Sequence, residues 1–367
     1  MAWNWQLRSW SHFEFTPEVL LPYEKTFLQK AGMLYGSMKH ISNENQDELK
    51  IMLLSDEAFQ TSKIEGELLD RDSLQSSIRK HFDLQADKSK VSLAEDGVSK
   101  MMIDLYRNYS SPLTHEQLFL WHEMLMNERR DLQDIGSYRT HKDPMQIVSG
   151  SMGRPIVHFE APPSSAVKKE MDKYISWFND TGDKYSDSLV KSGIAHLYFE
   201  SIHPFEDGNG RIGRALSEKV LSQYLERPTL IALSHVIENN KKLYYSSLHL
   251  NSKEIEITGW LEYFCETILQ AQDYTQRMID FTISKTKYFQ EFDEKFNERQ
   301  RKVVNRIFRE GIEGFKGGLS ADNYIKITGT TASTATRDLK KMVDLGAFIK
   351  TGERKSTRYQ LNLILDN

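Results

Sequence analysis

HPFEDGNGRIGR, residues 203–214, brings one histidine, two carboxylates, three glycines, an asparagine and two arginines together within twelve residues. The preceding SLVKSGIAHLYFESI (188–202) has apolar residues at helical spacing, and Pro204 cannot continue that helix without losing a backbone hydrogen bond. The glycines permit a tight loop, and RIGRALSEKVLSQ (211–223) begins another helix. The stretch therefore predicts two helices joined by a glycine-rich loop, with His203 at the end of the first.

The polar residues of this loop fit one kind of chemistry. A glycine-rich turn that leads into a helix N-terminus binds anions, because unpaired backbone N–H groups point into the loop. Arg211 and Arg214 share a helix face and can donate to further phosphate oxygens, and Asp207 is placed as a ligand for magnesium. A histidine can accept a proton near neutral pH, so His203 is a candidate general base. Together these residues predict an enzyme that acts on a magnesium-bound nucleotide, although the loop is not a Walker A motif.

The same stretch matches a known family signature at every position. HPFEDGNGRIGR resembles the signature of the Fic (filamentation induced by cAMP) family, and HLYFESI before it is similar to the central helix of that family. The resemblance implies a mainly α fold, with an all-α core that carries a β-hairpin flap. Most members transfer AMP from ATP to a Ser, Thr or Tyr hydroxyl of a protein. A protein adenylyltransferase that uses ATP and Mg²⁺ is therefore the function that the resemblance implies.

The resemblance also implies roles for the residues of the loop. His203 corresponds to the general base and Asp207 to the magnesium ligand. Attack of the target hydroxyl at the α-phosphorus would expel pyrophosphate, and catalysis would come mainly from positioning and charge neutralisation. The phosphates of ATP would be held by Gly208, Asn209, Gly210, Arg211 and Arg214. The intact GNGR sequence favours AMP transfer over the transfer of phosphate or phosphocholine, which some relatives carry out.

Two further segments resemble substrate-binding parts of Fic proteins. MQIVSGSMGRPIVHF (145–159) alternates two β-prone runs around a turn, which predicts a hairpin. Together with GSYRT (136–140) it resembles the flap, so a target protein would dock at residues 147–159 by backbone pairing. NNKKLYYSSL (239–248) resembles the segment that contacts the nucleotide base and sugar. Its candidate contact residues are Asn240, Tyr244 and Tyr245.

TSKIEGE, residues 61–67, fits the inhibitory pattern of the family, with Thr61, Glu65 and Gly66 at the defined positions. The resemblance implies that an N-terminal helix leans over the nucleotide and that Glu65 pairs with Arg214. Glu65 would then occupy the space of the γ-phosphate, so that ATP binds unproductively. An alternative stays open, in which Glu65 positions a water molecule that removes AMP, and the protein is bifunctional or de-AMPylating.

The pattern changes after residue 296. Three helical segments are followed by FIKTGERKSTRYQLNL (348–363), which predicts two short strands around a basic turn, and this order is typical of a winged helix-turn-helix domain. From Phe296 onward the chain carries fourteen lysines and arginines against eight aspartates and glutamates, a balance of +6 in a chain of net charge −4. Residues 331–358 would contact DNA through their basic side chains. A DNA-binding regulator that senses a nucleotide is therefore the rival function.

Composition limits the remaining possibilities. A chain of 367 residues with 39% hydrophobic and 27% charged residues is typical of a soluble protein with two or three domains. A single cysteine, Cys265, excludes an intrachain disulfide and a zinc site built from cysteines. The sequence shows no signal-peptide core and no membrane span, so we expect a cytoplasmic protein without a membrane segment. A homodimer stays open.

Four segments are expected along the chain. WNWQLRSW (3–10) and the helix after it resemble a module that accompanies some bacterial Fic proteins. The expected segments are an N-terminal helical region with the inhibitory motif (1–100), the Fic catalytic core (101–280), a helical linker (281–295) and the winged-helix domain (296–367).

Overall fold

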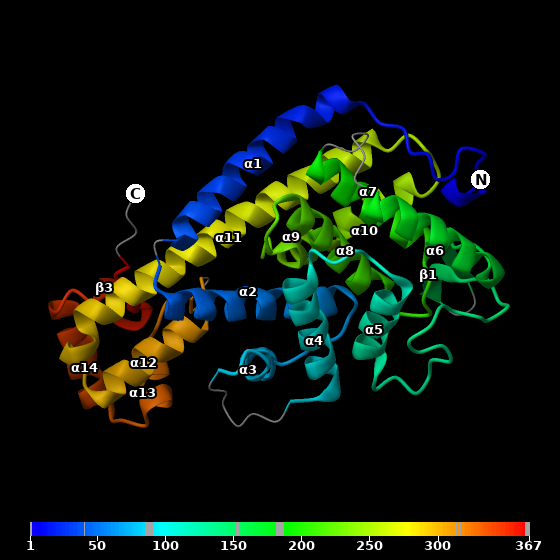
Figure 1. Cartoon of the computed structure of the whole chain (residues 1–367). Helices are drawn as coiled ribbons and strands as arrows, with labels where there is room; N and C mark the ends of the chain where they lie inside the picture. Colours follow the sequence, from blue (N-terminus) through cyan, green and yellow to red (C-terminus); the bar gives the residue numbers. More distant parts are fainter. Residues whose placement is uncertain are drawn as a thin grey trace. The chain divides into compact units, whose positions relative to one another are not determined.

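The structure is a computed structural model that describes residues 2–39, 41–84, 91–151, 154–180, 187–312, 314–315 and 317–363. The chain divides into two compact units, residues 1–36 with 50–275 and residues 37–49 with 276–367. Both are built mainly from helices, and the strands described form two antiparallel hairpins (Figure 1). The predicted mainly α fold with a hairpin is confirmed, whereas the segment boundaries expected from the sequence stay a prediction.

Helices make up most of the first unit. Three of them, α1, α2 and α11, also contribute residues to the second unit. The helices are η1 (Asn4–Gln6), α1 (Pro17–Lys39), α2 (Asn43–Ile64), α3 (Arg71–His81), α4 (Leu93–Asn108), α5 (His115–Met126), α6 (Ser164–Asn179), α7 (Ser188–Ile202), α8 (Asn209–Tyr224), α9 (Leu233–Asn239), α10 (Lys241–Asn251) and α11 (Thr258–Phe292). The hairpin consists of β1 (Gln146–Ser151) and β2 (Arg154–Glu160).

Helix α7 lies in the core of the first unit, and nearly all of its residues are buried. Its sequence is apolar on every side, as expected for a helix that other helices surround. Leu197 of α7 belongs to one apolar cluster with Phe27 of α1, Leu221 of α8 and Trp260 of α11. The indole of Trp260 also donates to the carbonyl of Gly193 at 2.8 Å. The C-terminal end of α7, where His203 follows, is therefore held in a fixed place.

The hairpin β1–β2 is the one predicted for the flap. Its strands pair antiparallel, with Val148 opposite Val157, and the register shifts between Ile147 and Val148. The apolar side chains of Ile147, Val148, Ile156 and Val157 are exposed. The turn was predicted within SGSMGRP (149–155), of which residues 152–153 lie outside the described residues. The N-terminal segment supports the base of the hairpin, because the indole of Trp5 donates to the carbonyl of Glu160 at 2.7 Å.

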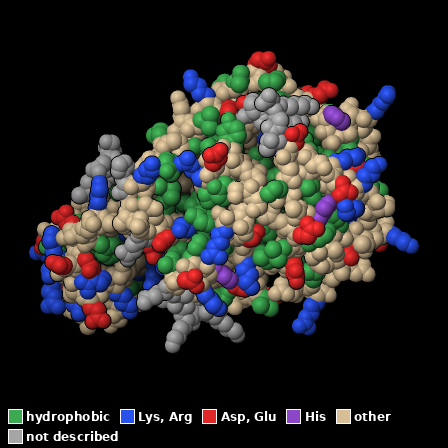
Figure 2. Space-filling model, in the orientation of Figure 1, with side chains coloured by type: hydrophobic (Ala, Val, Ile, Leu, Met, Phe, Trp, Pro, Cys, Tyr) green, Lys and Arg blue, Asp and Glu red, His purple; other side chains and the backbone are tan. Residues whose placement is uncertain are grey.

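The second unit contains the three helices and two strands that the sequence predicts after residue 296. They are α12 (Glu298–Arg309), α13 (Ala321–Thr328), α14 (Ala332–Asp344), β3 (Phe348–Thr351) and β4 (Arg358–Leu361), with short 3-10 turns η3 (Asp293–Lys295) and η4 (Arg354–Ser356). Side chains of Asn297, Ser320 and Thr331 cap the three helices, as their sequence positions indicate. Lysine and arginine side chains are dense on this unit (Figure 2). Its assignment as a winged helix stays a prediction.

Among the described residues, none of the helices combines the length and apolar character needed to span a bilayer.

Candidate active site

His203 ends helix α7 in a left-handed backbone conformation, with φ 49° and ψ 61°. Non-glycine residues adopt this conformation only where the surrounding structure holds them in it. Arg139 provides such support: its buried guanidinium donates from Nε to the carbonyl of His203 at 2.8 Å and from Nη2 to the carbonyl of Pro162 at 2.5 Å. The backbone of His203 is thereby tied to the segment that follows the hairpin.

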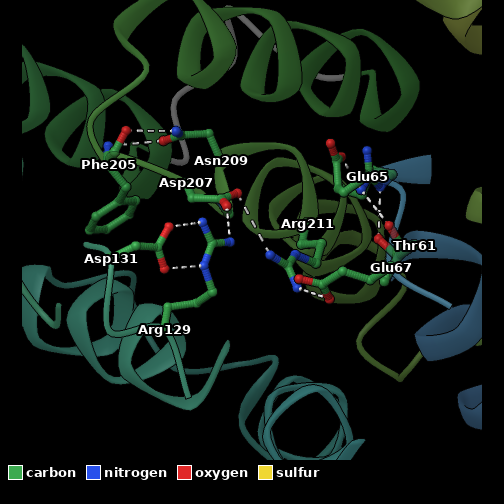
Figure 3. A network of polar contacts seen from close by, with 11 residues as sticks. Thr61, Glu65, Glu67, Arg129, Asp131, Phe205, Asp207, Asn209 and Arg211 are labelled. Carbon is green, nitrogen blue, oxygen red and sulfur yellow. Dashed lines mark hydrogen bonds and ion pairs between the residues drawn. The ribbon is translucent and has the colours of Figure 1, made fainter. Parts of the chain in front are cut away.

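The loop after His203 leads directly into helix α8. Gly208 has φ 80°, a backbone conformation that residues with a side chain rarely adopt, so this position favours glycine. The side chain of Asn209 donates to the carbonyl of Phe205 at 2.9 Å and accepts from its N–H at 3.0 Å (Figure 3). Asn209 therefore uses its amide to close the loop, while the first N–H groups of α8 remain available to an anion.

Arg214 is held by the segment 61–67. Its Nε donates to Oγ1 of Thr61 at 2.8 Å, and its Nη2 donates to Oε1 of Glu65 at 2.7 Å and to the carbonyl of Thr61 at 3.0 Å. Burial by itself would lower the pKa of Arg214, but the carboxylate of Glu65 outweighs this effect and raises it. Arg214 is fully buried beneath these partners and remains charged. The predicted contact between Glu65 and Arg214 is thus present in the structure.

Arg211 has a carboxylate partner from the same segment. Its Nη1 donates to Oε2 of Glu67 at 2.7 Å (Figure 3). Gly66 between the two glutamates has φ 87°, a conformation that glycine adopts readily, and it reverses the chain after Glu65. Glu65 and Glu67, only two residues apart, can therefore each reach a different arginine of α8.

Asp207 is paired with a cation as well. Nη1 of Arg129 donates to Oδ2 of Asp207 at 2.5 Å, and the same guanidinium makes two hydrogen bonds of 2.8 Å to Asp131 (Figure 3). The two carboxylates, Asp131 first, raise the pKa of Arg129 against the opposing effect of burial. The described residues contain no cluster of three or more histidine, cysteine, aspartate or glutamate side chains suited to a metal ion.

A cavity of about 740 Å³ adjoins these residues. Its walls come from the hairpin, α7, α10 and the loop at the start of α8, and Glu65 closes one side. Tyr244 and Tyr245 both line it, and the hydroxyl of Tyr244 is hydrogen-bonded to Nε2 of His196 at 2.7 Å. Asn240, the third candidate of that segment, is exposed and does not line the cavity. Of the other predicted site residues, His203, Asp207, Gly208, Asn209 and Gly210 also line the cavity, whereas Thr61, Gly66, Arg211 and Arg214 do not.

Residues 112–221 match the model of the Fic/DOC family. The chain contains a Fic domain. Residues 3–84, which precede the Fic domain, match a second family model, described as a domain of unknown function (DUF4172). The model of the domain of unknown function covers the segment 61–67, and the Fic model covers the loop 203–214.

Two curated relatives match limited stretches of the chain. A probable protein adenylyltransferase of Aquifex aeolicus is 36% identical over 90 residues, which are 24% of this chain and 25% of the relative. A protein adenylyltransferase of Caenorhabditis elegans is 30% identical over 84 residues, 23% of this chain and 16% of the relative. The matched stretch thus spans a quarter or less of the length of these curated relatives.

Two solved structures share the fold of the chain. A Fic family protein of Desulfovibrio desulfuricans G20 superposes with a TM-score of 0.52 at 21% identity, over 93% of this chain and 96% of that protein. A Fic-domain signalling protein of Bacteroides thetaiotaomicron superposes with a TM-score of 0.50 at 18% identity, over 67% of this chain and 95% of that protein. At these identities the comparison shows a common fold around the Fic domain.

Three charged residues beside the Fic loop were not predicted from the sequence. Glu67 follows Gly66 directly, and its position beside a predicted inhibitory glutamate is the one signal that could have indicated it. Arg139 lies in GSYRT, which resembles part of the flap, but nothing there shows that its guanidinium reaches the carbonyl of His203. Arg129 has no local signal, because its partner Asp207 is 78 residues away in the chain.

Proposed function

We propose that this chain is a protein adenylyltransferase that transfers AMP from ATP to a Ser, Thr or Tyr hydroxyl of a target protein. The observation that carries the proposal is that His203, Asp207 and the glycine-rich start of α8 all line one cavity. Such a cavity is large enough for a nucleotide. The names of the relatives from Aquifex aeolicus and Caenorhabditis elegans support the same activity. Transfer of label from ATP radiolabelled at the α-phosphate to protein tests it.

In the proposed reaction the α- and β-phosphates lie at the start of α8, and a target segment pairs with the hairpin at residues 147–159. His203 accepts the proton of the target hydroxyl. The hydroxyl oxygen forms a bond to the α-phosphorus as the bond to pyrophosphate breaks. Gly210 has no side chain that would fill the space beside Arg214, since a Cβ atom there would lie 3.1 Å from Nη1 of that arginine. Tyr244 and Tyr245 would contact the nucleoside, whereas Asn240 would reach it only after a rearrangement.

Asp207 would hold the magnesium ion. Mg²⁺ commonly binds one or two protein carboxylates together with substrate phosphates, so a lone aspartate beside a phosphate site fits this metal. The side chain of Asp207 is 33% exposed and already stabilises a positive group, the guanidinium of Arg129. Arg129 would keep its bidentate contact with Asp131 when it releases Asp207. The ion would neutralise charge on the phosphates.

The proposal includes autoinhibition by the segment 61–67. Thr61 and Glu65 accept hydrogen bonds from the guanidinium of Arg214, which would otherwise meet the γ-phosphate. Glu67 accepts a hydrogen bond from Arg211. A Cβ atom on Gly210 would lie 2.2 Å from Oε1 of Glu65, so the inhibitory carboxylate reaches over the phosphate loop itself. Both arginines must exchange a carboxylate for phosphate oxygens before ATP binds in the productive arrangement.

Glu67→Gln is expected to tighten the binding of ADP about fivefold. Arg211 follows Gly210 directly in the sequence, and we expect it to support the β-phosphate, which ADP retains. Removal of the Glu67 charge leaves Arg211 with only its longer ion pair, at 3.7 Å from Oδ1 of Asp207, among the described residues. The lost pair, in which Glu67 is partly exposed, is worth about 1 kcal/mol. Isothermal titration calorimetry with ADP measures the change.

Glu65→Gly is the matched control for that measurement, because ADP has no γ-phosphate to compete with Glu65 for Arg214. It should change the affinity for ADP less than Glu67→Gln does. Equal ADP affinities of the wild type and Glu67→Gln would contradict a role of Glu67 in autoinhibition.

DNA binding through residues 331–358 is a second proposal. Arg337, Lys340 and Lys341 on α14 are exposed, as a surface that contacts phosphates requires. In a gel-shift assay the full chain should retard duplex DNA at low salt, and the double variant Lys340→Glu, Lys341→Glu should not. No retardation of DNA by the wild type at low salt would exclude this function. A homodimer and a cytoplasmic location stay predictions.

A further inference from the structure

Glu200 is a buried carboxylate that faces the ring of His203. It lies three residues earlier on α7, and its Oε2 is 3.6 Å from Nδ1 of His203. Both side chains are 11% exposed. Among the described residues, neither Nδ1 of His203 nor Oε1 of Glu200 has a hydrogen-bond partner, although both atoms are buried. Buried polar atoms are nearly always hydrogen-bonded, so these two side chains are suited to each other.

The surroundings of Glu200 allow it to stay ionised inside the protein. Burial raises the pKa of Glu200, but His203, His196 and Arg214 together outweigh this effect and hold it below its usual value. Helix α8 makes room for the carboxylate, since a Cβ atom on Gly213 would lie 3.0 Å from Oε1 of Glu200. Glu200 is therefore a negative charge held beside the ring of the proposed base.

The neighbouring carboxylate in the loop is committed elsewhere. Oε2 of Glu206 accepts from the backbone N–H of Gln133 at 2.9 Å, which ties it to the segment after α5. No ion pair or hydrogen bond is described between Glu206 and His203. Of these two carboxylates, Glu200 is the one placed to act on the imidazole.

We propose that Glu200 is a positioning residue for His203, which accepts a hydrogen bond from Nδ1–H and so leaves Nε2 free to take the proton of the target hydroxyl. This inference rests on the proposed function. Arg139 already holds the backbone of His203, so the contact with Glu200 would fix the orientation of the imidazole ring. The tautomer of a histidine is set by the hydrogen bond of its other nitrogen. At 3.6 Å the two atoms are just beyond hydrogen-bond distance, and catalytic contacts of this kind commonly tighten when a substrate binds. The negative charge of Glu200 would also stabilise the imidazolium that forms.

Nuclear magnetic resonance of protein labelled with ¹⁵N-histidine tests the inference without any need for activity. The signal of His203 is assigned by its loss in His203→Ala. We expect protonated Nδ1 in the neutral ring of the wild type. Glu200→Gln should retain this tautomer, since the amide oxygen still accepts. Glu200→Leu should lose the tautomer preference, because it offers no acceptor.

Activity adds a second readout. In a Glu65→Gly background, Glu200→Gln should lower AMP transfer about tenfold, and Glu200→Leu should lower it further. Glu200→Asp keeps the carboxylate, so AMP transfer should fall less in this variant. Thermal unfolding shows which variants are folded, and the nearly isosteric Glu200→Gln keeps the test valid if Glu200→Leu does not fold.

Glu206→Gln is the matched control, because it removes a carboxylate of the same cavity wall that does not contact the ring. A tautomer preference that Glu200→Leu retains would overturn the inference. So would the loss of that preference in Glu206→Gln, which would show that the effect is not specific to Glu200. A complete lack of AMP transfer in every variant would overturn the proposed function, whereas the resonance of His203 would still decide the role of Glu200.

Discussion

His203→Ala is expected to lower AMP transfer by roughly 10²–10⁴-fold, the usual contribution of a general base. The imidazole is the one group on the wall of the cavity that combines a basic nitrogen with a position at the end of α7, directly beside the phosphate loop. Without it, the target hydroxyl would have to lose its proton to water. The measurement is label transferred to protein from ATP radiolabelled at the α-phosphate, in a Glu65→Gly background.

The binding of ATP is the control for this variant. His203 is not expected to hold the phosphates, so its replacement should leave the affinity for ATP nearly unchanged. Label that arrives from the γ-phosphate instead of the α-phosphate would show phosphate transfer and contradict the reaction. Transfer that is undiminished in His203→Ala would contradict the role of the imidazole.

Glu65→Gly should raise AMP transfer and self-modification by roughly 5–150-fold, which corresponds to a coupling free energy of about 1–3 kcal/mol. The substitution removes the carboxylate that holds Nη2 of Arg214 at 2.7 Å and clears the space above Gly210. Arg214 keeps its hydrogen bonds to Thr61, so it stays in position to receive a γ-phosphate. Equal labelling of wild type and variant would show that Glu65 does not restrain the enzyme.

The same pair of proteins distinguishes inhibition from removal of AMP. If Glu65 positions a water molecule for removal, the wild type should release AMP from a modified target in the absence of ATP, and Glu65→Gly should not. In that case the higher labelling of the variant reflects lost removal as well as faster transfer. No release of AMP by the wild type would leave inhibition as the role of Glu65.

Local sequence was enough to predict the elements that carry the site. Pro204 and the glycines around Asn209 indicate a helix end, a tight loop and a helix start, and the structure confirms all three. The alternation in residues 145–159 predicted the hairpin for the same reason, since strand and turn preferences act between close neighbours. The hydrogen bonds between the side chain of Asn209 and the backbone of Phe205 were not predicted, because they depend on the closed shape of the loop.

By itself the sequence predicted a glycine-rich loop between two helices, a histidine at its edge and a glutamate in a segment that resembles the inhibitory motif of Fic proteins. These features depend on residues within a few positions of one another, whose backbone preferences act locally. The resemblance to Fic proteins implied that Glu65 meets Arg214, but only the tertiary structure showed the partners of Arg211 and Asp207. Glu67 reaches Arg211 across 144 residues of chain, and Glu65 reaches Arg214 across 149. Such pairs form because the segment after α2 lies beside α8, whose arginine side chains are buried, and a buried charge without a partner is costly.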